Sequence, residues 1–115
     1  LGIARRYSAI TGDTNINAQS LFADFNRNSL AREIIESAAA ILGKEIAIFG
    51  NSLPTKVIVI GGGLWMGSEI YRNLVLTSFR KIAKELGYNG NILSAAVSDA
   101  GVIGTAIYAL DSLTN

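Results

Sequence analysis

Three consecutive glycines after a run of β-branched residues are the feature best suited to ligand chemistry. The run is Val57-Ile58-Val59-Ile60, followed by Gly61-Gly62-Gly63. Glycine has no Cβ, so the backbone amides of such a turn can approach a ligand closely near a helix N-terminus, as nucleotide binding requires. The spacing fits neither the Walker loop nor the dinucleotide fingerprint, since no Lys-Ser/Thr follows and Gly67 has the wrong offset. A tight strand-to-helix turn without a ligand therefore stays open as an alternative.

A second cluster of small residues lies near the end of the sequence, in the segment Ser98–Ala106. Gly101 and Gly104 fall inside a predicted helix, where each costs roughly 1 kcal/mol relative to alanine. Close packing against a neighbouring element would compensate for that cost, and so would contact with a ligand at the helix start. Asp99 is a candidate carboxylate base, but an Asp at this place is more often a helix cap. We therefore assign no catalytic residue.

Two further groups of side chains have alternative interpretations. A basic side on the helix after the glycines suits a phosphate or is simply solvated; it consists of Arg72, Arg80, Lys81 and Lys84. The pair Trp65-Met66 lies in a predicted loop, where it would cover an adenine, pack on the core or meet another subunit. The sequence alone does not decide between these roles.

Composition excludes several kinds of chemistry within these residues. The chain has no Cys and no His, so thiolate nucleophiles, imidazole bases and zinc sites built on either residue are excluded, and no metal ligand is assigned. Ten basic and nine acidic side chains give a net charge of +1, too small for a nucleic-acid-binding surface. No apolar stretch is long enough to cross a bilayer, so we expect a soluble protein.

Hydrophobic spacing and capping residues predict alternating helices and strands. Helices are expected over residues 1–10, 17–25, 30–49, 68–86 and 99–113, and strands over residues 57–60 and 91–97. The core face of the long helix is predicted to be Leu30, Ile34, Ala38, Leu42, Ile46 and Phe49. That of the next helix is predicted to be Ile70, Leu74, Val75, Phe79, Ile82 and Leu86.

The fold class that follows is α/β, with residues 1–115 forming a single domain. Four β-branched residues in a row, without alternation, indicate a strand covered on both faces in a parallel or mixed sheet. Two strands are too few for a stable sheet. Because the sequence also begins with Leu1 rather than Met, we expect a piece of a longer chain in which the mixed sheet is incomplete.

Several linked features resemble the C-terminal portion of the ROK family of bacterial sugar kinases and sugar-responsive repressors. They are Leu42-Gly43, Asn51, Pro54, the segment from Val57 to Gly63, and the segment from Asp99 to Ala106. Two departures are Leu53 before the proline and Arg27-Asn28 in place of the common Gly-Asp. The resemblance implies an actin-like (ribonuclease H-like) ATPase fold, with ATP between two lobes and Gly61, Gly62 and Gly63 beside its adenosine.

The resemblance also implies what the parent protein does. It would be a cytoplasmic, glucokinase-like hexose kinase that uses ATP and Mg²⁺, binds its sugar through the missing lobe and forms a homo-oligomer. The phosphate-binding Asp-x-Gly-x-Thr segment, the catalytic Asp and the His/Cys zinc site of the family lie upstream, so these residues alone should be inactive. The alternatives are the sugar-sensing domain of a repressor, and a nucleotide-binding or oligomerising domain without catalysis.

Overall fold

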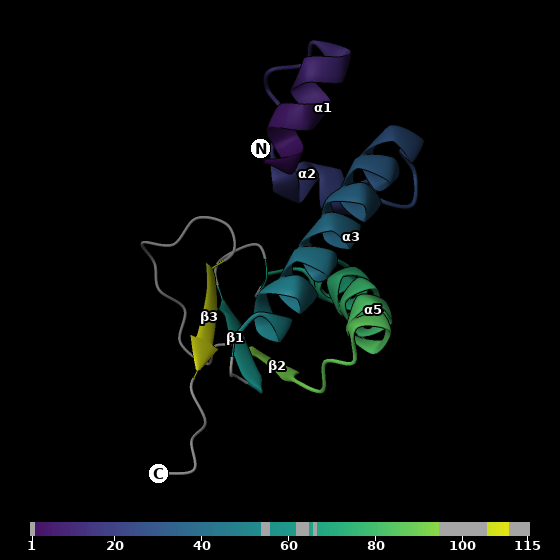
Figure 1. Cartoon of the computed structure of the whole chain (residues 1–115). Coiled ribbons are helices and arrows are strands. Elements are labelled where there is room, and N and C mark those ends of the chain that lie inside the picture. Colours follow the sequence, from purple (N-terminus) through teal and green to yellow (C-terminus); the bar gives the residue numbers. More distant parts are fainter. Residues whose placement is uncertain (1, 54–55, 62–64, 66, 95–105, 111–115) are drawn as a thin grey trace.

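The computed structural model describes residues 2–53, 56–61, 65, 67–94 and 106–110, the last range by its backbone only. Its helices are α1 (Ile3–Thr11), α2 (Ala18–Ala23), α3 (Ser29–Asn51) and α5 (Glu69–Leu86), and its strands are β1 (Val57–Gly61), β2 (Asn91–Ser94) and β3 (Ala106–Leu110). Figure 1 shows α1 and α2 at one end of α3, and α5 and the sheet toward its other end. The radius of gyration is 15.0 Å, against about 13 Å for a compact domain of this length.

Capping residues mark the starts of the two long helices and the end of α5. At the start of α3 the Asn28 Oδ1 atom accepts hydrogen bonds from the backbone N–H groups of Leu30 and Ala31, both at 3.1 Å. Ser68 Oγ accepts from the N–H of Tyr71 at the start of α5, at 3.1 Å. Gly87 ends α5 in the left-handed conformation, with a φ of 74° that a side chain would disfavour. Local sequence therefore determines where both helices begin and where α5 ends.

Helices α3 and α5 approach each other closely where they cross. A Cβ built on Gly43 would lie 2.6 Å from Val75 O and 2.8 Å from Phe79 N, both backbone atoms of α5. Beside this point Ser78 Oγ donates a hydrogen bond of 2.7 Å to Ala40 O. Gly43, which the sequence placed inside a helix without a role, is thus what allows the two helices to approach so closely.

The buried faces of α3 and α5 match the predicted ones in part: the predicted residues that are partly buried against the core are Leu30, Ala38, Leu42, Leu74 and Ile82. In α3 the buried residues are Ala31, Ile34, Ile35, Ala39, Gly43, Ile46, Ala47 and Gly50, so Ile34 and Ile46 are confirmed, whereas Phe49 is 40% exposed. In α5 they are Tyr71, Val75, Phe79 and Ala83, which confirms Val75 and Phe79 but leaves Ile70 and Leu86 exposed. In α3 the buried face includes several small residues, which a search for large apolar side chains misses.

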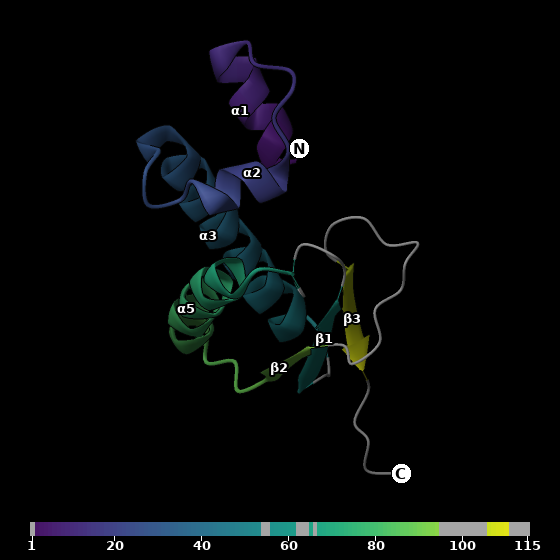
Figure 2. The same cartoon turned by 180° about the vertical axis from the view of Figure 1, so that it is seen from behind.

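The sheet has the order β2-β1-β3, with β1 in the centre. Strand β2 runs parallel to β1, pairing Ile60 with Ser94, and β3 runs antiparallel, pairing Gly61 with Ala106. Figure 2 shows the same three strands from behind. Ile58 and Ile60 are fully buried and belong to the same core as Val75, whereas Val57 and Val59 are half-buried. The α/β class and the mixed sheet are therefore present.

The predicted last helix is wrong over its described part. Residues 106–110 form strand β3 and not a helix. The physical reason is the pairing partner, because a central strand has a second edge of N–H and C=O groups that must be satisfied, and β3 provides those bonds along all of β1. Residues 98–105, with Asp99 and both glycines of the predicted helix, lie outside the described residues, as do positions 95–97 of the predicted second strand.

The N-terminal helices are attached to α3 by polar contacts. Asn28, which caps α3, also donates from Nδ2 to the hydroxyl of Tyr7 on α1, at 3.0 Å. The Arg32 guanidinium lies 5.6 Å from the ring centre of Phe25 and donates from Nε to the carbonyl of that residue at 3.2 Å. One residue, Asn28, therefore both starts α3 and holds α1 against it.

Candidate functional site

The glycine run follows β1 at the carboxyl edge of a parallel strand pair. Gly61 is buried at the last position of β1, and Ser94 at the end of β2 lies beside Ile60, its partner in the register. In open α/β sheets ligands bind outside the carboxyl ends of parallel strands. The structure thus places Gly61 at an edge suited to ligand binding, while Gly62 and Gly63 lie outside the described residues.

Trp65 is a buried anchor four residues after Gly61. Its side chain is 1% exposed, and its backbone is helical rather than in the predicted loop. The indole Nε1 donates a hydrogen bond of 2.9 Å to Ser94 Oγ. Of the three roles open from the sequence, packing on the core is therefore the one that the structure shows for Trp65, and Met66 lies outside the described residues.

The predicted basic side of α5 divides into two parts. Arg80, Lys81 and Lys84 are exposed, as expected of a solvated face. Arg72 is half-buried, and its Nη1 donates a hydrogen bond of 2.8 Å to the carbonyl of Trp65. Arg72 thus serves the chain itself, a role that the sequence interpretation missed because no local pattern links a guanidinium to a carbonyl seven residues earlier.

The N-terminus of α5 is already occupied by the chain's own groups. Ser68 caps it, and Glu69 is an acidic residue in its first turn. A carboxylate there offsets the positive end of the helix dipole, which is the part that attracts phosphate. This helix end is therefore better suited to a neutral part of a ligand than to its phosphates.

The acidic side chains that the structure describes are the next candidates for a site. Among the described residues, no group of three or more acidic side chains is placed to hold a metal ion. Asp99 is outside that range, so its predicted capping role stays a prediction. Within the same part of the chain, no helix is long and apolar enough to cross a membrane.

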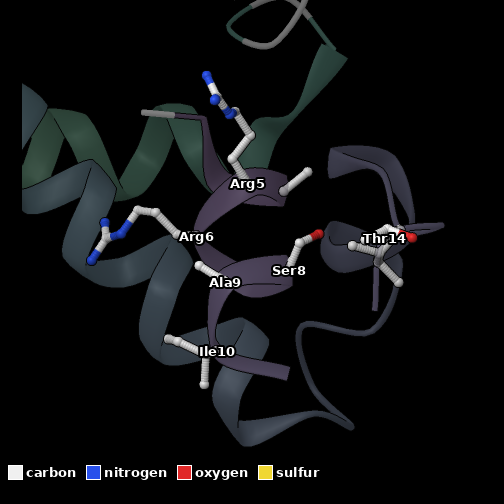
Figure 3. A pocket seen from close by; sticks show the side chains of 8 residues that line it. Arg5, Arg6, Ser8, Ala9, Ile10 and Thr14 are labelled. Carbon is white, nitrogen blue, oxygen red and sulfur yellow. The ribbon is translucent and has the colours of Figure 1, made fainter. Parts of the chain in front are cut away.

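A shallow hollow lies at the other end of the molecule, along α1 and the loop after it (Figure 3). Its lining consists of Ala4, Arg5, Arg6, Ser8, Ala9, Ile10, Thr14 and Ile16. Figure 3 shows the guanidinium groups of Arg5 and Arg6 pointing away from each other. Their charges do not converge on one ligand, so the carboxyl edge of the sheet is the better candidate site.

Comparison with known protein families gives the same assignment as the motifs in the sequence. The model of the ROK family matches residues 1–112. The chain belongs to the ROK family. No curated protein and no solved structure matched it.

Two features of the ROK resemblance now have structural roles. Gly43 of the Leu42-Gly43 pair allows the close approach of α3 and α5, and Val57–Gly61 is the central strand of the sheet. The family contains sugar kinases and sugar-responsive repressors, so a carbohydrate-related function follows for this chain.

Proposed function

We propose that this chain supplies the adenosine-binding side of the ATP cleft in a sugar kinase of the ROK family. The observation that carries the proposal is the position of Gly61, buried at the end of the central strand where parallel strands present their carboxyl edge. A glycine run at this edge allows the backbone to approach a flat ligand without steric hindrance from Cβ atoms. ROK membership provides the second support.

The electrostatics of α5 favour contact with the nucleoside over contact with the phosphates. Glu69 and the Ser68 cap occupy the helix end that would otherwise attract an anion. By resemblance to the family, the phosphates and Mg²⁺ belong to the upstream Asp-x-Gly-x-Thr segment, and the base that accepts the sugar proton is an upstream Asp. Phosphoryl transfer requires all these groups together, so the 115 residues alone should not turn over ATP.

Isothermal titration with adenosine, AMP, ADP and ATP tests this assignment. We expect weak binding with dissociation constants that agree within about threefold across the series, because each added phosphate gains no contact. GTP is the matched control, and it should bind more weakly if the base is recognised. Absence of binding for all adenine ligands would refute the adenosine role, and sugar-dependent ATP turnover by these residues would refute the expectation of inactivity.

The repressor alternative rests on the same family membership, because both classes share this region. A transcriptional regulator would carry a basic helix-turn-helix segment upstream and would bind its sugar without ATP turnover. The sequence of the parent upstream of Leu1 distinguishes the two: an immediate hydrophobic strand with Asp-x-Gly-x-Thr would favour the kinase.

A further inference from the structure

The side of α3 that faces away from α5 carries two exposed isoleucines. Ile41 and Ile48 are 51% and 47% exposed, whereas Gly43, which lies against the backbone of α5, is buried. With about 3.6 residues per helical turn, Ile41 and Ile48 share one side of α3, roughly opposite Gly43. We call Ile41, Lys44, Glu45 and Ile48 the outer stripe of α3.

Two opposite charges lie between the isoleucines of the outer stripe. Lys44 and Glu45 are both exposed, and neither forms an ion pair with another residue that the structure describes. Adjacent residues point about 100° apart around a helix, so these two side chains flank the stripe on its two sides. The middle of the stripe therefore offers one positive and one negative charge to a partner.

The outer stripe is complementary to itself in an antiparallel pair of helices. The midpoint between Ile41 and Ile48 falls between Lys44 and Glu45, so a twofold axis at that point brings Ile41 of one copy onto Ile48 of the other. The same axis places Lys44 of each copy within reach of Glu45 of the other. A twofold interface must match its own surface, and a stripe with charges of one sign would repel its copy.

We propose that the outer stripe of α3 is a docking surface for a second copy of this chain, packed antiparallel about a twofold axis. Burial of the isoleucines drives the association, and the pairs of Lys44 with Glu45 set its register. A stable interface buries about 800 Å² on each partner, more than one helix stripe provides, so we expect a weak and reversible dimer. The proposal is independent of the adenosine role, because it rests on the stripe alone.

Analytical ultracentrifugation of the chain between about 10 μM and 1 mM tests the proposal, and we expect a monomer–dimer equilibrium. Ile48→Ser should raise the dissociation constant about tenfold or more, because it removes an isoleucine from both sides of the contact. Ile10→Ser is the matched control, since Ile10 is 64% exposed but lies on α1. That variant should leave the dissociation constant unchanged, and circular dichroism should show that both variants are folded.

Exchanging the two charges tests the antiparallel register. Lys44→Glu leaves only carboxylates around the axis, and Glu45→Lys leaves only ammonium groups. Each single variant should weaken the dimer about three- to tenfold, and less at high salt, where the repulsion is screened. The double variant has both charges again, so its dissociation constant should return to within about twofold of the wild-type value.

The outcomes that overturn the proposal are distinct. A chain that stays monomeric at about 1 mM does so, as does Ile10→Ser weakening the association as much as Ile48→Ser. A double charge variant that associates no better than either single variant also overturns it, because the charges then meet a partner other than their own copy. Oligomers that grow beyond the dimer overturn the twofold contact, which is closed. None of these measurements uses a nucleotide, so their failure leaves the adenosine role intact.

Discussion

Replacing Gly43 with alanine tests whether α3 and α5 cross as closely as the structure shows. The new Cβ would lie 2.6 Å from both Val75 O and Ser78 Cβ, inside van der Waals distance. Val75 O belongs to the backbone of α5, so relief requires the helices to separate. Such overpacking costs about 1–3 kcal/mol, and separation also weakens the Ser78 hydrogen bond, worth about 1 kcal/mol. The better helix propensity of alanine returns about 1 kcal/mol.

The net expectation is a loss of about 2 kcal/mol in the free energy of unfolding. With a urea dependence of about 2 kcal/mol per molar, the unfolding midpoint should fall by about 1 M, as measured by circular dichroism. Gly67→Ala is the matched control, because its Cβ would meet nothing within 4 Å. That variant should leave the midpoint unchanged or raise it slightly. An equal rise for Gly43→Ala would refute the close crossing.

Three further predictions concern a helix cap, a glycine with positive φ and a buried tyrosine. Asn28→Ala should lower the unfolding free energy by about 1–2 kcal/mol in urea melts, because it removes the α3 cap and the hydrogen bond to Tyr7. If the loss is no greater than that caused by Tyr7→Phe, the cap contributes nothing. Gly87→Ala should cost about 1 kcal/mol in the same assay, because the φ of 74° disfavours a side chain, and an unchanged midpoint would contradict that conformation. Burial raises the pKa of Tyr71 above its ordinary value of 10.0, so the stability it contributes should be complete below pH 10 and lost as pH rises through the folded-state pKa. Unfolding midpoints measured from pH 9 to 11 should therefore fall less steeply for Tyr71→Phe, and identical slopes would exclude this cause.

Elements with strong local signals were predicted well from the sequence. The run Val57–Ile60 is β1 apart from one added glycine, and both long helices lie within a few residues of their predicted ranges. Asn28 and Ser68 cap the starts of α3 and α5, and Gly87 ends α5 in the left-handed conformation. Each of these signals arises from residues within one turn or one strand, which is why it is visible without tertiary structure.

The errors concern contacts between residues far apart in the sequence. Strand β3 owes its conformation to pairing with β1, about 50 residues earlier, and such pairing overrides local helix preference. Trp65 packs in the hydrophobic core, and Ser94 of another element accepts a hydrogen bond from its indole N–H. In the candidate site, the position of Gly61 was predictable from its strand, whereas the roles of Arg72 and Ser94 depended on contacts that no spacing rule describes.

The contacts of Trp65 also bear on the alternative interpretation of the glycine run, in which it is a tight turn that binds no ligand. Such a turn needs glycines for its backbone but has no need of a tryptophan whose indole N–H and backbone carbonyl are both hydrogen-bonded to other elements. Burying those two polar groups with partners fixes one arrangement at the end of the connection, at the edge where ligands bind α/β sheets. If Trp65 served packing alone, Ser94→Ala would change stability without changing adenine-nucleotide affinity. An accompanying loss of adenine-nucleotide affinity would therefore distinguish a binding turn from a plain one.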